Sequence, residues 1–313
     1  MVTLKELSLR QEPLTGGHRA CAGCGFPQIV RMVLLASKDP VVVVSATGCL
    51  EVTTTIFPFS AWQVPFLHNA FENAAATLSG IEAAYKALKA KGKVNRPINF
   101  VAFGGDGGTY DIGLQSLSGA MERGHNLLYV CYNNEAYMNT GVQRSGATPR
   151  GSNTTTEPAG KVRAGKLQAR KDLTAIMAAH NIPYVAQAAG GYYMDLIRKA
   201  EKAFATPGAK FINVLQPCRL GWGYKPQLTM ELSRLAVQAC LWPIYEVENG
   251  KWKLSLKPKE KKPVVEILKL QDRFRHLFRP GNEQLLEQIQ ADVDKNWENL
   301  LERCGEKIQG GAI

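Results

Sequence analysis

Short runs of apolar, β-branched residues recur along the chain. Four of them are nearly continuous, at residues 41–46, 98–104, 127–132 and 211–215. Runs of this length and composition predict strands that are buried on both faces, as in a parallel sheet.

The segments between these runs have the spacing of helices. They lie at residues 27–36, 71–90, 112–123, 172–180 and 193–205. Gly92 and Gly124 follow two of them, where a left-handed helix cap would sit. Because strands and helices alternate from residue 27 to residue 240, we predict an α/β protein with a doubly wound, mostly parallel sheet.

Two segments depart from this alternation. Residues 140–171 are rich in Gly, Thr, Pro and Ser, and they are too long for an ordinary connection, so we expect a functional or disordered loop. From residue 246 the composition shifts to Lys, Glu and Pro, followed by a polar helix-like stretch at 282–302. We therefore predict an α/β domain over residues 1–245 and a C-terminal extension, 246–313, that packs on partner subunits.

Composition and charge narrow the class of protein. The 45% hydrophobic content is enough for a full core. No apolar run approaches the roughly 20 residues that span a bilayer, and the first ten residues lack a signal-peptide core, so we expect a cytoplasmic protein without membrane contact. The net charge of +11 suits an anionic partner, but the basic stretches lack interleaved aromatics, which favours a solvated face or an acidic protein over nucleic acid.

Seven cysteines in an unexported chain indicate ligation rather than disulfides. Cys21 and Cys24 share a tight turn, and Cys49 and Cys218 each follow a predicted strand. Because parallel strands end at one edge of a sheet, the four thiols can converge, as a 4Fe-4S cluster requires. There are three alternatives: a zinc site, a dithiol redox pair, or four unrelated thiols. A structural zinc site usually has two short-spaced pairs of ligands, and only one such pair is present. The three other cysteines fit buried core positions.

A second group of residues predicts a phosphate and metal site. The strand at 98–104 runs into a glycine turn containing Asp106, where backbone amides can approach a diphosphate and the carboxylate can bind Mg²⁺. A dinucleotide fingerprint fails, because Tyr110 stands where glycine is required. Asn134 follows the next strand, at the same edge. A Gly-Asp-Gly turn and a later Asn resemble the thiamine diphosphate signature.

Together these motifs resemble the β subunit of the 2-oxoacid:ferredoxin oxidoreductases, the pyruvate enzyme above all. The matching segments, in order, are residues 18–25, 46–51, 105–109, 134–145 and 217–218. The similarity extends from about residue 17 to the end of the chain. It implies the diphosphate-binding domain of thiamine enzymes, with a cluster close to the cofactor.

The resemblance also implies roles for individual residues. Cys21, Cys24, Cys49 and Cys218 would hold the 4Fe-4S cluster, and Asp106, Asn134 and the Ala136 carbonyl would bind Mg²⁺. Residues that would line or bind thiamine diphosphate also include Gly25, Thr47, Gly48, Cys49, Gly105, Gly107, Gly108, Asn139, Thr140 and Gly141. His68, Asn139 and Gln143 are candidates for the catalytic, substrate side, with core or loop roles as the alternative for His68 and Gln143.

The implied reaction is the oxidative decarboxylation of pyruvate or a related small 2-oxoacid, with electrons passing through the cluster to ferredoxin. An α subunit would supply the activating glutamate and most substrate contacts, and a further subunit would carry ferredoxin-type clusters. Coenzyme A would accept the acyl group from pyruvate, whereas oxalate would need none. A branched 2-oxoacid, a non-redox thiamine decarboxylase or carboligase, and a zinc-stabilised nucleic-acid-binding subunit are the alternatives.

Overall fold

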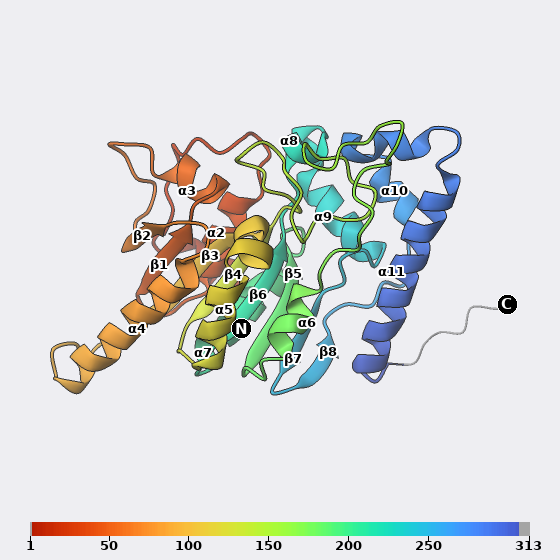
Figure 1. Ribbon diagram of the computed structural model, residues 1–313. Coiled ribbons are helices and arrows are strands. Elements are labelled where there is room, and N and C mark those ends of the chain that lie inside the picture. The colour runs from red at the N-terminus through yellow and green to blue at the C-terminus, as the bar shows by residue number, and fades with distance from the viewer. Residues whose placement is uncertain (1, 307–313) are drawn as a thin grey trace.

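The computed structural model describes residues 2–306, and within this range the chain is built on one eight-stranded sheet (Figure 1). The strand order is β2-β1-β3-β4-β6-β5-β7-β8. The first six of these are parallel to one another. Strand β7 pairs antiparallel with β5, and β8 pairs antiparallel with β7. The strands are β1 Val41–Ala46, β2 Phe66–Asn69, β3 Asn99–Gly105, β4 Leu128–Asn133, β5 Tyr184–Ala189, β6 Lys210–Leu215, β7 Tyr245–Glu248 and β8 Lys251–Leu254.

Helices cover both faces of the sheet. The α-helices are α1 Leu4–Ser8, α2 Phe26–Leu35, α3 Cys49–Thr54, α4 Ala74–Ala90, α5 Leu114–Glu122, α6 Leu173–Ala178, α7 Tyr193–Ala205, α8 Arg219–Trp222, α9 Thr229–Gln238, α10 Val264–Leu268 and α11 Glu283–Arg303. A π-helix spans Gly107–Ile112, and 3₁₀ helices span Pro226–Leu228 and Asp272–Phe278.

The side chains of each central strand alternate between two hydrophobic cores. Val101 and Phe103 of β3 pack with α2 and α7, whereas Phe100 and Ala102 pack with α4, α5 and α6 on the other face. A sheet buried on both faces needs apolar residues at consecutive positions, which is why these strands are continuous apolar runs. The predicted doubly wound α/β fold is confirmed.

The predicted strands agree with β1, β3, β4 and β6 within one residue at each end. Gly92 and Gly124 have positive φ values of 68° and 64°, as expected for left-handed caps. The strands β2, β5, β7 and β8 were not predicted. Within the described residues, no helix has both the length and the apolar character needed to cross a membrane.

The segment after residue 245 continues the same sheet and core. The proposed boundary between 245 and 246 falls inside β7, which pairs with β5. Val247, Ile267 and Trp297 belong to the same core as Val185 of β5. The predicted polar helix at 282–302 corresponds to α11. Packing of this segment on partner subunits stays a prediction.

Residues 140–171 contain no long regular element but are anchored over the ends of the strands. Ser145 and Thr148 are fully buried there, and Lys166 is 1% exposed. The Lys166 ammonium donates hydrogen bonds to the carbonyl oxygens of Thr148 and Ala169. The buried parts of this loop therefore pack at the edge of the sheet where the predicted sites lie, whereas residues 160–163 stay exposed.

Candidate cofactor and metal site

Five neighbouring parallel strands, β2, β1, β3, β4 and β6, end at one edge of the sheet. Ligand sites of open α/β sheets lie outside the carboxyl ends of their strands. The strand ends bring together His68, Thr47, Gly105, Asn134 and Cys218.

A hollow at this edge is lined by most of the residues predicted to bind the cofactor. These are Thr47, Gly48, Cys49, Gly105, Gly107, Gly108, Asn134, Ala136, Asn139 and Thr140. The other lining residues are Phe71, Tyr132, Tyr137 and Met138. Of the remaining predicted cofactor residues, Gly25 packs against Gln216 and Thr229, Asp106 is fully buried, and Gly141 follows the lining loop.

The glycine turn after β3 is glycine-rich because other groups approach its backbone closely. A Cβ atom on Gly107 would lie 2.3 Å from the ring of Tyr137, and one on Gly108 would lie 3.0 Å from the carbonyl oxygen of Phe71. Both neighbours line the hollow. A side chain at Gly107 would therefore displace the wall that faces the hollow.

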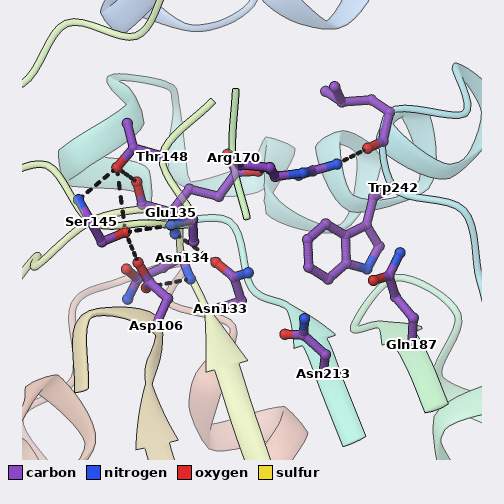
Figure 2. Close-up of polar contacts among 12 residues, drawn as sticks. Asp106, Asn133, Asn134, Glu135, Ser145, Thr148, Arg170, Gln187, Asn213 and Trp242 are labelled. Carbon is purple, nitrogen blue, oxygen red and sulfur yellow. Dashed lines mark hydrogen bonds and ion pairs between the residues drawn. The ribbon is translucent and has the colours of Figure 1, made fainter. Parts of the chain in front are cut away.

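Asp106 and Asn134 meet at the ends of β3 and β4 (Figure 2). Asp106 Oδ1 accepts a hydrogen bond from the Asn134 backbone N–H (3.1 Å), and Oδ2 accepts one from the Ser145 hydroxyl (2.5 Å). Burial raises the pKa of Asp106 to about 7, and these hydrogen bonds partly oppose the shift. Desolvation disfavours an isolated carboxylate, so this site favours a bound cation or a proton.

The Asn134 side-chain amide lies between two oxygens. One of its two terminal atoms is 2.9 Å from Asp106 Oδ1 and 2.8 Å from the Ala136 carbonyl oxygen. With nitrogen at this position the amide donates to both; with oxygen there, three oxygens converge without a proton between them. The first orientation suits the metal-free protein, and the second suits a bound cation.

Glu135, which lies between Asn134 and Ala136 in the sequence, has an unusual backbone conformation. Its φ is 69°, and its side chain is buried. Its carboxylate forms ion pairs with Arg170 (3.1 Å) and Arg273 (2.5 Å). The Trp222 indole N–H donates to the Asn134 carbonyl oxygen at 2.8 Å. Two cations and an indole therefore fix a backbone that ordinarily avoids this region.

The Cys21–Cys24 turn packs on the segment that follows β6 and contains Cys218. Gln216 Nε2 donates to Cys24 Sγ at 3.5 Å, and the Thr229 hydroxyl donates to the Gly23 carbonyl oxygen at 2.5 Å. Cys218 caps α8 and accepts a hydrogen bond from the Gly221 N–H at 3.4 Å. Cys49 is the first residue of α3. All seven cysteines are free of disulfides.

The four predicted cluster ligands share one electrostatic environment. The pKa of Cys24 and that of Cys49 are both raised to about 12, mainly by burial, and Cys21 and Cys218 contribute in the same direction to both. Among residues 2–306 there is no group of three or more His, Cys, Asp or Glu side chains that could hold a metal ion. The thiols are therefore neighbours without forming a compact single-ion site.

The residues predicted for the substrate side lie at the rim. His68 is exposed, and its Nε2 is 2.9 Å from the hydroxyl of Thr47, which lines the hollow. Gln143 exchanges hydrogen bonds with the Thr140 hydroxyl (2.5 Å) and carbonyl (2.7 Å). Asn139 is exposed and lines the hollow. Gln143 therefore shapes the loop beside the hollow.

The sequence assigned no role to Ser145, Glu135, Arg170, Arg273 and Trp222. Glu135 and Ser145 lie in the matching segment 134–145, and Arg170 lies in the unusually long loop 140–171. Arg273 and Trp222 carry no motif of their own. A larger hollow behind Arg170, lined by Trp242, Tyr245 and Trp252 among others, contains none of the predicted residues.

Comparison with known proteins agrees with this geometry. Residues 46–214 match the family model described as the thiamine pyrophosphate enzyme, C-terminal TPP binding domain. The 2-oxoglutarate:ferredoxin oxidoreductase from Magnetococcus marinus has a similar fold, with a TM-score of 0.57 and 17% identity over 96% of this chain and 94% of that chain. The fold and the site thus define a thiamine pyrophosphate-binding domain.

Curated relatives match nearly the whole chain. Pyruvate synthase subunit PorB of Methanocaldococcus jannaschii is 54% identical over 91% of this chain and 95% of its own length. PorB of Thermotoga maritima is 51% identical over 95% and 94%. Ketoisovalerate oxidoreductase subunit VorB of Pyrococcus abyssi is 44% identical over 93% of each chain. The chain belongs to the β-subunit family of the 2-oxoacid:ferredoxin oxidoreductases that contains PorB and VorB.

Proposed function

We propose that this chain is the β subunit of an enzyme that oxidatively decarboxylates pyruvate and passes the electrons to ferredoxin. The observation that carries the proposal is the convergence, at one sheet edge, of an oxygen-lined cation site, a hollow for a diphosphate and four neighbouring thiols. The match to PorB chains over more than nine-tenths of the sequence supports the same function.

The first component is a Mg²⁺ site formed by Asp106, Asn134 and the Ala136 carbonyl. Neighbouring oxygens around an octahedral Mg²⁺ at roughly 2.0–2.1 Å lie about 2.8–3.0 Å apart. The distances of 2.9 Å and 2.8 Å from the Asn134 amide match this edge length. The residues therefore fit Mg²⁺, and binding would also remove the cost of burying the Asp106 carboxylate.

The second component is the hollow beside that site, which would hold thiamine diphosphate. When bound, the cofactor supplies a carbanion for addition to the 2-oxoacid carbonyl and an electron sink for decarboxylation. Gly107 and Gly108 leave room for the diphosphate at the backbone. Thr47 and Gly48 form the wall nearest His68, which would orient the substrate from the rim.

The third component is a 4Fe-4S cluster on Cys21, Cys24, Cys49 and Cys218. Burial and the neighbouring Cys21 and Cys218 raise the pKa of Cys24 and Cys49, so these thiols require positive charge before they can ionise, and iron would supply it. A cluster places each thiolate on a separate iron, so its ligands stand farther apart than those of a single zinc ion.

Partner chains would complete the enzyme, which we expect to be cytoplasmic. An α subunit would supply the activating glutamate, and a further subunit would carry ferredoxin-type clusters. Phe57 and Phe59 are 94% and 76% exposed, beside α3, which carries Cys49. Large apolar side chains exposed near a site are typical of a surface that another chain covers.

Pyruvate is the proposed substrate because two relatives named for pyruvate synthase are 54% and 51% identical, whereas VorB is 44% identical. Two further PorB chains, at 43% and 42%, are no more similar than VorB, so a branched 2-oxoacid is tested beside pyruvate. The test is to co-express the chain with its partner subunits and to assay viologen or ferredoxin reduction with pyruvate, 2-oxoisovalerate and oxalate, each with and without coenzyme A. We expect fast, coenzyme A-dependent reduction with pyruvate.

Other outcomes would replace the substrate or the function. Faster reduction with 2-oxoisovalerate would assign a branched substrate, and reduction with oxalate alone would remove coenzyme A from the reaction. A complex that contains thiamine diphosphate but no iron would contradict the redox function and favour a decarboxylase or carboligase. A complex that contains zinc but neither iron nor thiamine diphosphate would contradict the redox function and the decarboxylase or carboligase alternative, and it would favour the zinc-stabilised nucleic-acid-binding subunit.

A further inference from the structure

Arg273 is a buried cation between the candidate metal loop and the candidate cluster. It lies in the 3₁₀ helix Asp272–Phe278 and is 5% exposed. Its Nη2 contacts Glu135 Oε2 at 2.5 Å, and its Nε donates to Gln271 Oε1 at 2.8 Å. Its guanidinium lies 3.9 Å from the ring centroid of Trp222.

The third nitrogen of this guanidinium, Nη1, is buried and has no hydrogen-bond partner among the described residues. Buried donors are almost always paired, and the donors of an arginine are charged, so an orphan is unusual. Of the other two nitrogens, Nη2 pairs with Glu135 and Nε with Gln271. The Nη1 N–H bonds are therefore available to an acceptor outside the described chain.

The segment that carries Cys218 is one of the neighbours of Arg273. The Asp272 backbone N–H donates to the Gly223 carbonyl oxygen at 3.1 Å, next to α8, whose cap is Cys218 and whose last residue is Trp222. Burial lowers the pKa of Arg273, and the nearby Glu135 and Cys218 oppose this effect. Arg273 therefore feels the charge of the Cys218 sulfur.

The charges of Glu135, Arg170 and Arg273 do not cancel one another. Glu135 is shared by Arg170 and Arg273, so the trio carries one net positive charge. Reduction of an iron–sulfur cluster by one electron adds negative charge, and hydrogen bonds to its sulfurs together with nearby charge set its potential. A cation with a free donor at this position would favour the reduced cluster.

We propose that Arg273 is a positioning residue for electron transfer, which donates a hydrogen bond from Nη1 to a sulfur of the cluster at Cys218 and makes the cluster easier to reduce. The proposal rests on the proposed function, because it needs the cluster. Through Glu135 and Trp222 the same side chain also fixes the backbone of the Mg²⁺ loop.

The test is a redox titration of the cluster, followed by electron paramagnetic resonance, in the assembled complex with wild-type chain, Arg273→Gln and Arg273→Lys. Loss of the charge and the donor in Arg273→Gln should lower the equilibrium constant for one-electron reduction by at least about tenfold, which is about 59 mV toward negative potential. Arg273→Lys keeps the charge without the planar fork, so its shift should be smaller.

Arg275→Gln is the matched control, because Arg275 is an exposed arginine of the same 3₁₀ helix and is outside the Arg170–Glu135–Arg273 trio. The cluster potential of this control should equal that of the wild type. Resonance Raman bands of the iron–thiolate bonds should shift in both Arg273 variants and not in the control.

An unchanged potential and unchanged Raman bands in an iron-loaded Arg273 variant would overturn the proposal. If Arg273→Gln fails to load iron, Arg273→Lys decides by the same two measurements. A wild-type complex that contains no iron contradicts the proposed function itself, so the two failures are distinguishable.

Discussion

At the scale of single residues, Asp106 shows how the candidate metal site is built. It is a fully buried carboxyl group whose neighbours are the Asn134 backbone, the Ser145 hydroxyl and the Asn134 amide. The Gly-Asp-Gly turn and Asn134 were predictable because each directly follows an apolar strand. Ser145 was not, because its place depends on how the 140–171 loop packs.

Asp106→Ala should abolish Mg²⁺-dependent binding of thiamine diphosphate while leaving iron content intact. Loss of an outer-shell partner alone weakens metal binding about 10–100-fold, so removal of a direct ligand should weaken it by more than about 100-fold. Calorimetric titration of the cofactor with Mg²⁺, together with iron quantification, measures both effects.

Glu122→Ala is the control, since this carboxylate is exposed at the end of α5. It should change neither quantity. Loss of iron in Asp106→Ala would mean that the two sites are one unit and would contradict their separation.

At the scale of elements, strands were predictable where both faces are buried and the residues are β-branched. The run VVVVSA of β1 was predicted at its observed bounds. Strand β5, with sequence YVAQAA, is equally buried but rich in alanine, whose propensity for strands is low. Strands β7 and β8 alternate apolar and charged residues over only four positions each, and tertiary pairing decides their state.

The 140–171 loop gives a pH-dependent prediction. Burial lowers the pKa of Lys166 to about 8, because its ammonium has only carbonyl acceptors. Between pH 8 and about 10.5 the unfolded chain binds more protons at this residue than the folded chain. The contribution of Lys166 to the free energy of unfolding should therefore rise with pH in this window, by at most about 1.4 kcal/mol per pH unit.

Denaturant unfolding of wild type and Lys166→Met at pH 8 and pH 10 measures this contribution. The difference between the two proteins should change in favour of the wild type as the pH rises. Lys161→Met, which removes an exposed lysine of the same loop, serves as the control. An equal difference at both pH values would show that the Lys166 ammonium is not desolvated.

At the scale of the whole molecule, the residues after 245 share a core with the sheet. A chain that ends at residue 245 would expose one edge of β5 and the apolar residues that face α10 and α11. We expect this truncated chain to be insoluble or to unfold without cooperativity. Trp297→Ala should lower the free energy of unfolding by about 3–5 kcal/mol.

Circular dichroism melts of the truncated and substituted chains would show whether residues 1–245 fold without the segment that follows them. Cooperative unfolding of residues 1–245 at the wild-type temperature would restore the independent extension that composition predicted. The shift to Lys and Glu at residue 246 falls inside β7, and the buried positions of β7, α10 and α11 alternate with those charges.

The parallel frame also has an evolutionary consequence. The loop with Asp106 follows β3 and the segment with Cys218 follows β6, and only β4 lies between these two strands, so β3 and β6 run about 10 Å apart, two strand spacings. The parallel frame therefore ties the loop of the proposed metal site to the segment of the proposed cluster. We expect lineages that favour pyruvate or ketoisovalerate to differ in the rim loops while they share this strand frame.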